Sequence, residues 1–314
     1  MSMFWRKARR VITFVAALYL LACCALGIFL AEAALHPWRK PITRRAEVRA
    51  MVAERYHTHL QEVAISAADG ALLRGWFARP DAGNGDVVVL LHGVADNREG
   101  MAGFAEFLLS HGYSVLLPDA RAQGESGGDL ATYGVLEADD VHRWVDWLYG
   151  SQHPDCVFGM GESLGAALVL ESLRTQPRFC AVVAESPFAT FREVAFDRVG
   201  EKLSTGPWLG RTLLRPAVEA GLLYARLRYK VDLGHANPGD AVAGTHVPVL
   251  LIHGLADRNI PPQNSEEMHA RNPAHTVLWE VPGAGHCGAV NAAPQEFDRR
   301  VLGWFGRATS APRS

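Results

Sequence analysis

The sequence has little net charge, no internal repeat and no low-complexity tract. Its 314 residues include 31 lysines and arginines against 33 aspartates and glutamates, which gives a formal net charge of −2. Such a balance provides no overall attraction to nucleic acid or anionic surfaces, so we expect no nucleic-acid partner. Apolar residues make up 49% of the chain, which is typical of a globular protein with a substantial core.

Cysteine is also scarce, with five residues and no CxxC pair. A chain of this length with so few cysteines does not indicate a disulfide framework, and the missing CxxC argues against a structural zinc site. We therefore predict that all five are small apolar filler, and we expect no metal and no organic cofactor. The cysteines are Cys23 and Cys24 in an apolar run, Cys156 and Cys180 at the starts of two expected strands, and Cys287 beside a histidine.

Long apolar runs occur once, near the N-terminus. The stretch "VITFVAALYLLACCALGIFLA" carries no charge from Val11 to Ala31, and 21 helical residues would cover roughly 30 Å, the thickness of a bilayer core. We predict a transmembrane anchor over residues 1–35. Two alternatives stay open, namely signal cleavage at "AEA" (31–33) and lipoprotein processing at "LLAC" (20–23).

The orientation of this anchor is not fixed by charge alone, because four basic residues precede the apolar run and four follow it. The preceding ones lie closer to it, and the N-terminal tail is short. We therefore expect a single-pass protein with its N-terminus inside and the rest of the chain on the extracytoplasmic side.

The rest of the chain alternates between strand and helix patterns. Residues 36–60 form a connector, residues 61–80 read as a β-hairpin around Asp69-Gly70, and apolar β-branched runs then alternate with amphipathic helical segments. This pattern predicts a mostly parallel eight-stranded α/β sheet with helices on both faces, over about residues 61–306. We expect residues 307–314 to be a disordered tail.

One stretch interrupts the alternation, at about residues 188–243. A structureless loop of this length would be unusual in a compact domain, and apolar residues recur in it at helical spacing. We predict two or more helices that form a cap. Six side chains could face an acyl chain or simply pack on the body: Trp208, Leu213, Leu214, Leu222, Leu223 and Tyr224.

The pattern G-x-S-x-G occurs twice, at Ser126 and at Ser163. The pattern is informative only where a strand runs into it and a helix runs out of it. Ser163 follows "CVFGM" and precedes "LGAALVL", whereas Ser126 follows a polar loop and precedes more glycine. We therefore predict Ser163 as a nucleophile held on a sharp strand-to-helix turn.

A serine nucleophile needs a base, and the base needs a carboxylate that orients it. His286 in "PGAGHCG" follows the last expected strand, and Asp257 in "HGLADRNIPP" follows the one before. Glu185, one strand earlier, is the rival acid. The other candidates for the base are histidines beside strand ends or on a helix end, which we expect to be structural: His92, His253, His57 and His59.

Acyl transfer also needs N–H donors for the developing oxyanion. The N–H that follows the nucleophile belongs to Leu164. The second donor should come from the loop after the strand "VVVLLHG", where Val94 is the candidate. Only the backbone of each residue is required.

The stretches "LLHGVADN", "PDARAQGESGG", "GMGESLG", "LLIHGLADRNIPP" and "PGAGHC" together resemble the α/β-hydrolase superfamily, particularly its bacterial membrane-anchored branch of serine esterases and peptidase-like hydrolases. The resemblance covers about residues 60–306 and implies Ser163, Asp257 and His286 as the triad, with Val94 and Leu164 as oxyanion donors. One loop departs from the usual R-G-x-G-x-S, since it reads "RAQGES".

The expected activity is therefore that of a carboxylesterase-like serine hydrolase acting on a small acyl substrate. A peptidase or thioesterase of the same fold, and a catalytically inactive binding module, are the alternatives.

Overall fold

The computed structural model describes residues 3–174, 178–202 and 207–310, and its chain divides into two compact units. The smaller unit consists of Met1–Leu35 and Phe191–His235, and the larger one of His36–Thr190 and Ala236–Ser314. The larger unit is thus formed by two separate chain segments.

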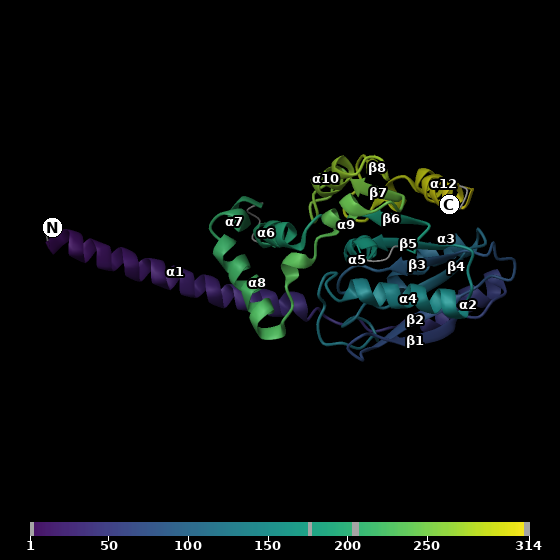
Figure 1. The fold of residues 1–314 in the computed structure, drawn as a ribbon, viewed down its shortest axis with the longest axis horizontal. Helices are drawn as coiled ribbons and strands as arrows, with labels where there is room; N and C mark the ends of the chain where they lie inside the picture. Colours follow the sequence, from purple (N-terminus) through teal and green to yellow (C-terminus); the bar gives the residue numbers. More distant parts are fainter. Residues whose placement is uncertain (1–2, 175–177, 203–206, 311–314) are drawn as a thin grey trace. The chain divides into compact units, whose positions relative to one another are not determined.

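The larger unit is built on an eight-stranded sheet with the strand order β1-β2-β4-β3-β5-β6-β7-β8 (Figure 1). The β1–β2 and β2–β4 pairs are antiparallel, and every pair from β4 to β8 is parallel. The predicted hairpin and the mostly parallel sheet are confirmed. The strands are β1 (Gln61–Ser66), β2 (Leu72–Ala78), β3 (Val87–Leu91), β4 (Ser114–Pro118), β5 (Val157–Glu162), β6 (Ala181–Glu185), β7 (Val249–Gly254) and β8 (Thr276–Val281).

Helices cover both faces of this sheet. On one face the helices α3 and α12 pack against the strands, and on the other the helix α5 packs against β3, β5 and β6 and contacts α4 and α9. The helices of this unit are α2 (Arg45–Tyr56), α3 (Ala102–Leu109), α4 (Glu137–Ser151), α5 (Leu164–Glu171), α9 (Pro238–Gly244), α10 (Gln263–Arg271), α11 (Ala289–Ala292) and α12 (Pro294–Ser310), with short 3₁₀ turns at Arg98–Met101 and Ser172–Arg174.

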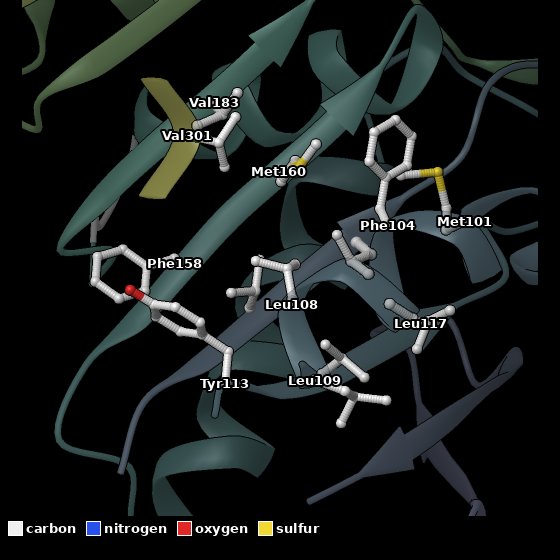
Figure 2. Close-up of a cluster of buried hydrophobic side chains, with 14 of the residues drawn as sticks. Met101, Phe104, Leu108, Leu109, Tyr113, Leu117, Phe158, Met160, Val183 and Val301 are labelled. Carbon is white, nitrogen blue, oxygen red and sulfur yellow. The ribbon is translucent and has the colours of Figure 1, made fainter. Parts of the chain in front are cut away.

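The two faces of β5 pack in different ways, one with large apolar side chains and the other with glycines. Phe158 and Met160 are fully buried in the apolar cluster beneath α3, which Figure 2 shows, and Phe305 of α12 stacks on Phe158 with ring centroids 4.4 Å apart. Because side chains alternate along a strand, Gly159 and Gly161 face the opposite side. The absence of side chains there lets α5 lie close to the strand.

The prediction that all cysteines are free is wrong for two of the five. Cys156 and Cys180 form a disulfide, with their Cα atoms 5.9 Å apart. They stand directly before β5 and β6, which are neighbouring parallel strands, and the N–H of Cys180 donates to the carbonyl of Val157. The strand register therefore brings the two thiols together, whereas their sequence separation does not reveal it.

The smaller unit is helical. It comprises α1 (Met3–Leu35), α6 (Phe191–Lys202), α7 (Pro207–Arg211), α8 (Arg215–Tyr229) and a 3₁₀ turn at Leu233–His235. Within this unit α8 packs obliquely across the C-terminal half of α1 (Figure 1). The segment Phe4–Leu35 is long and apolar enough to cross a membrane, so the expected N-terminal apolar helix is confirmed as a candidate span.

Two predicted boundaries differ from the structure. The interruption at about residues 188–243 consists mostly of helices among its described residues, but its last helix, α9, belongs to the larger unit. The cap role of this stretch stays a prediction. At the C-terminus, α12 continues to Ser310, so residues 307–310 are not the disordered tail that their polarity suggested. The guanidinium of Arg307 lies over the Trp304 ring, which stabilises this last turn, and residues 311–314 lie outside the described residues.

Candidate active site

Ser163 stands on a sharp corner between β5 and α5. Its backbone has φ 52° and ψ −113°, in the region that only a constrained turn imposes on a residue with a Cβ. A Cβ on Gly161 would lie 2.4 Å from the backbone of Gly165, and one on Gly165 would lie 2.0 Å from the carbonyl oxygen of Leu91. Both glycines are therefore required for the helix to begin so close to the sheet.

His286 lies between Ser163 and Asp257, in the loop that follows β8. Its Nε2 atom lies 2.9 Å from the Ser163 hydroxyl, and its Nδ1 atom lies 2.7 Å from Oδ2 of Asp257. An ionised carboxylate can only accept hydrogen bonds, so Nδ1 of the imidazole carries the proton. Nε2 is then free of a proton and accepts the hydrogen bond from the serine hydroxyl. The three residues come from the ends of β5, β7 and β8, as the sequence predicted.

Asp257 is buried and strongly hydrogen-bonded. Burial by itself would raise the pKa of this carboxyl, but hydrogen bonds from His253, His286 and the Ile260 N–H more than offset it, so the pKa lies well below its usual range. Oδ1 accepts from the N–H groups of Asn259 and Ile260 at 2.9 and 3.0 Å. The carboxylate therefore stays ionised and fixed in place beside the imidazole.

Leu164 and Val94, the predicted oxyanion donors, directly follow Ser163 and Gly93 in the chain. Leu164 is the first residue of α5, and the first N–H groups of a helix have no partner within it. Gly93, the neighbour of Val94, lies so close to Ser163 that a Cβ added to it would be 3.7 Å from the Ser163 Cβ. The buried Gln123 accepts the N–H of Ala95 at 2.6 Å, which holds this loop.

His92 and His253 support loops around the site. His92 is buried, accepts the Ala120 N–H through Nε2 at 3.1 Å and lies 2.8 Å from the Gly93 carbonyl through Nδ1; burial lowers its pKa. His253 is buried between Ser265 Oγ and the carbonyl of Ile260, and its Nε2 also lies 3.5 Å from Oδ2 of Asp257. The hydrogen bonds of both imidazoles therefore indicate that these histidines hold loops in place.

Ser126, the second serine in a G-x-S-x-G pattern, is fully buried and serves the loop that contains it. Its Oγ accepts the N–H of Arg74 at 2.9 Å and donates to the carbonyl of Asp119 at 2.8 Å. The Asp119 carboxylate in turn pairs with the buried Arg98 at 2.7 Å. These bonds cross-link β2, β4 and the 3₁₀ turn after β3, so this hydroxyl has a structural role.

Glu185, the rival acid, contacts the histidine loop rather than the imidazole. Its Oε1 accepts the N–H of Ala289 at 2.9 Å, and the next residue, Ser186, accepts the N–H of Cys287 through Oγ at 3.3 Å. Both Ser186 and Cys287 have positive φ, at 52° and 49°. The end of β6 thus fixes the backbone on the C-terminal side of His286, a role that the sequence reasoning did not assign to Ser186.

A second carboxyl, the half-buried Glu162, directly precedes Ser163 in the chain. It pairs with Glu185 in the β5–β6 register, so both side chains leave the sheet on the same face. Burial, and then the charges of Glu185 and Asp96, raise the pKa of Glu162 to about 8. Burial, together with the charges of Glu162 and Glu185, also raises the pKa of the Cys287 thiol.

The described residues contain no cluster of three or more histidine, cysteine or acidic side chains suited to a metal ion.

Comparisons with known proteins agree with this fold. Residues 88–300 match the model of the alpha/beta hydrolase family. A Mycobacterium tuberculosis protein, Rv2307c, is 32% identical over 246 residues, which are 77% of this chain and 76% of the relative. The Escherichia coli protein YfhR is 26% identical over 241 residues, covering 74% and 75% of the two chains.

Among solved structures, the Pyrococcus furiosus esterase Pf2001 has a TM-score of 0.69 and 25% identity over 88% of this chain and 98% of the esterase. The acylaminoacyl peptidase of Pyrococcus horikoshii has a TM-score of 0.59 at 18% identity, over 82% of this chain and 43% of the peptidase, and shares the fold alone.

Proposed function

Because the chain belongs to the alpha/beta hydrolase family, we propose that it is a serine hydrolase that cleaves an ester or a related acyl bond. Ser163 is the nucleophile, His286 the general base and Asp257 the acid that orients the histidine. The observation that carries the proposal is the pair of hydrogen bonds made by His286, 2.9 Å to the serine hydroxyl and 2.7 Å to the aspartate.

The reaction has two halves. In the first, Ser163 Oγ attacks the acyl carbon while its proton moves to His286 Nε2, and the same proton then passes to the leaving group as its bond to the acyl carbon breaks. In the second, water attacks the acyl-enzyme, giving its proton to Nε2. The Ser163–acyl bond then breaks, the proton returns to Oγ, and the free acid leaves.

Both halves pass through a tetrahedral oxyanion, which the N–H groups of Val94 and Leu164 stabilise. The positive end of α5 adds to this, since the helix begins at Leu164. The burial and hydrogen bonds of Asp257 support its role, because a permanently ionised carboxylate stabilises the imidazolium that forms in each half.

A fluorophosphonate probe tests this proposal directly, because it reacts with an activated serine. The wild-type chain should be labelled, and Ser163→Ala should not be. Labelling that persists in Ser163→Ala would overturn the assignment of the nucleophile. A wild-type chain that is never labelled would instead favour the inactive binding module.

An ester is the preferred substrate class because the solved relative with 25% identity, which this chain covers almost entirely, is an esterase. A peptidase of the same fold is the alternative, favoured by the fold shared with acylaminoacyl peptidase. A panel of 4-nitrophenyl esters of increasing acyl length, compared with aminoacyl 4-nitroanilides and acyl thioesters, separates the three reactions.

We also propose that α1 is a retained membrane anchor with the larger unit on the extracytoplasmic side. Cys23 and Ala31 of α1 are buried in the smaller unit, and Glu32 accepts hydrogen bonds from Tyr224 and Tyr229 of α8 at 2.6 and 2.8 Å. Removal of α1 as a signal peptide would take away the carboxylate to which both tyrosine hydroxyls donate. The Cys156–Cys180 disulfide supports the orientation, since such bonds persist in oxidising compartments. A mature chain that begins at Cys23 or Ala34 would contradict this proposal.

A further inference from the structure

The contact between α1 and α8 is a close helix–helix packing made by small residues. Four residues of α8 are buried, and three of them, Ala217, Gly221 and Ala225, are small and spaced four residues apart; the fourth is Val218. On the α1 side, a Cβ added to Gly27 would lie 2.2 Å from the carbonyl oxygen of Ala217 and 2.8 Å from the nitrogen of Gly221. Small residues at this spacing allow helices to approach as closely as they do inside membranes.

The start of α8 lies near Tyr19 of α1 and its C-terminal end near Glu32, so the two helices are in contact over much of the apolar run. The hydroxyl of Tyr19 donates to the carbonyl of Leu213, just before α8, and Glu32 of α1 meets Tyr224 and Tyr229 near its end. From Val11 to Tyr19 there is only about 12 Å of helix, far less than the roughly 30 Å of a bilayer core. An α1 that crosses the bilayer must therefore have α8 beside it within the apolar layer.

The side of α8 that borders α1 exposes apolar residues. Leu223 and Leu227 are 55% and 64% exposed, Leu213 just before the helix is 55% exposed, and the stripe continues through the half-buried Pro216 and Ala220. The spacing alternates between three and four residues, which places these side chains on one face. We call this set, Leu213, Pro216, Ala220, Leu223 and Leu227, the apolar stripe.

The apolar stripe is continuous with the surface of α1, because the Cβ of Ala220 would lie 3.1 Å from a Cβ on Gly27. The charged residues of α8 lie on its other side. Arg215 and Glu219 extend toward α6, where the guanidinium of Arg215 lies over the Phe196 ring and Glu219 pairs with Arg192. Arg226 and Arg228 are exposed near the C-terminal end of α8. The charges on this helix are therefore turned away from the apolar stripe or lie at the end where α1 leaves its apolar run.

We infer that the apolar stripe of α8 lies in the membrane beside α1, in the leaflet from which the rest of the chain emerges. The partner of this surface is the acyl region of the bilayer, and α1 and α8 enter it as one packed pair. The inference rests on the proposal that α1 is a retained anchor. It makes the insertion between β6 and α9 a membrane-contacting element, and it is independent of the identity of the nucleophile.

Site-specific photocrosslinking in the full-length chain tests the inference. Leu223 and Leu227 are each replaced by p-benzoylphenylalanine, and Arg226, on the charged face of the same helix and next to Leu227 in the sequence, is the matched control. Each protein is reconstituted in phosphatidylcholine vesicles and irradiated. Crosslinks to phospholipid should be several-fold stronger at the two leucine positions.

Three results would overturn the inference: no lipid crosslink at Leu223 and Leu227, equal crosslinking on both faces, or crosslinks between two copies of the chain. Carbonate extraction distinguishes a failure of this inference from a failure of the proposal that α1 is a membrane anchor. A chain released by carbonate shows that α1 does not span the bilayer, which removes the anchor and the inference together. A chain retained in the membrane without lipid crosslinks at the leucines contradicts the inference alone. Fluorophosphonate labelling reports separately on Ser163.

Discussion

Oδ2 of Asp257 lies 2.7 Å from Nδ1 of His286, whereas Glu185 reaches the same loop only at the N–H of Ala289. This difference predicts the cost of removing each charge. Asp257→Asn keeps the side-chain shape but allows the wrong histidine tautomer, so kcat on an activated ester should fall by roughly 10³–10⁴-fold. Steady-state kinetics with 4-nitrophenyl acetate measures the loss.

Glu185→Gln should cost far less, about tenfold in kcat, because the amide oxygen can still accept the N–H of Ala289. Glu185→Ala removes that acceptor and should cost more than the glutamine variant, since the backbone next to His286 is no longer held. Measuring both variants on the same ester separates a positioning role from the role of the orienting acid. An inactive Glu185→Gln beside an active Asp257→Asn would assign the acid to β6.

The two G-x-S-x-G serines should behave differently. Ser163→Ala should lose hydrolysis and probe labelling with little change in stability. Ser126→Ala should retain labelling and most activity but lose stability by about 1–3 kcal/mol, because the N–H of Arg74 and the carbonyl of Asp119 lose a buried partner. Urea unfolding and ester hydrolysis of the two variants provide the comparison. Loss of probe labelling in a folded Ser126→Ala protein would contradict it.

The sequence predicted the part of the site that local backbone geometry dictates. A strand-to-helix corner needs glycine at 161 and 165, and residues at the ends of parallel strands must meet at one edge, so Ser163, Asp257 and His286 could be selected before any coordinates. Their catalytic roles remain proposals. The structure adds their mutual distances and the support of the histidine loop by Glu185 and Ser186.

Features that depend on pairing between distant segments were not predictable in this way. The disulfide between Cys156 and Cys180 follows from the register of β5 against β6, which composition does not reveal. The packing of Gly221 on Gly27 joins helices almost two hundred residues apart in sequence, and small residues leave no periodic apolar signal. Both the disulfide and the helix contact depend on how distant segments align in the folded chain, which local sequence propensity does not determine.

Removing the disulfide should lower stability without affecting chemistry. It closes a loop with a sequence separation of 24 residues, and a double replacement of Cys156 and Cys180 by alanine should cost about 2–4 kcal/mol of unfolding free energy. The bond lies at the starts of β5 and β6, opposite the strand ends that precede Ser163, Asp257 and His286, so kcat should change little. Urea unfolding of the wild type with and without reductant should reproduce the loss. Equal midpoints in both conditions would contradict the prediction.

Glu162 should make the stability of the fold decrease as pH rises, and the substitution Glu162→Gln should remove this decrease. Burial, with the charges of Glu185 and Asp96, raises its pKa to about 8, whereas in the unfolded chain it titrates near 4.5. Between these values the folded chain holds a proton that the unfolded chain has released, so stability falls as pH rises. The contribution is complete below about pH 4.5, is lost progressively up to about pH 8, and is absent above it.

Glu162→Gln is neutral in both states and lacks this loss. The glutamine variant should therefore gain roughly 1–4 kcal/mol relative to the wild type between pH 5 and pH 9. Guanidinium unfolding at both pH values measures this gain, with the exposed Glu54→Gln as a control that should leave the wild-type dependence intact. Parallel pH dependences for the wild type and Glu162→Gln would show that the Glu162 carboxyl titrates alike in the folded and unfolded chains.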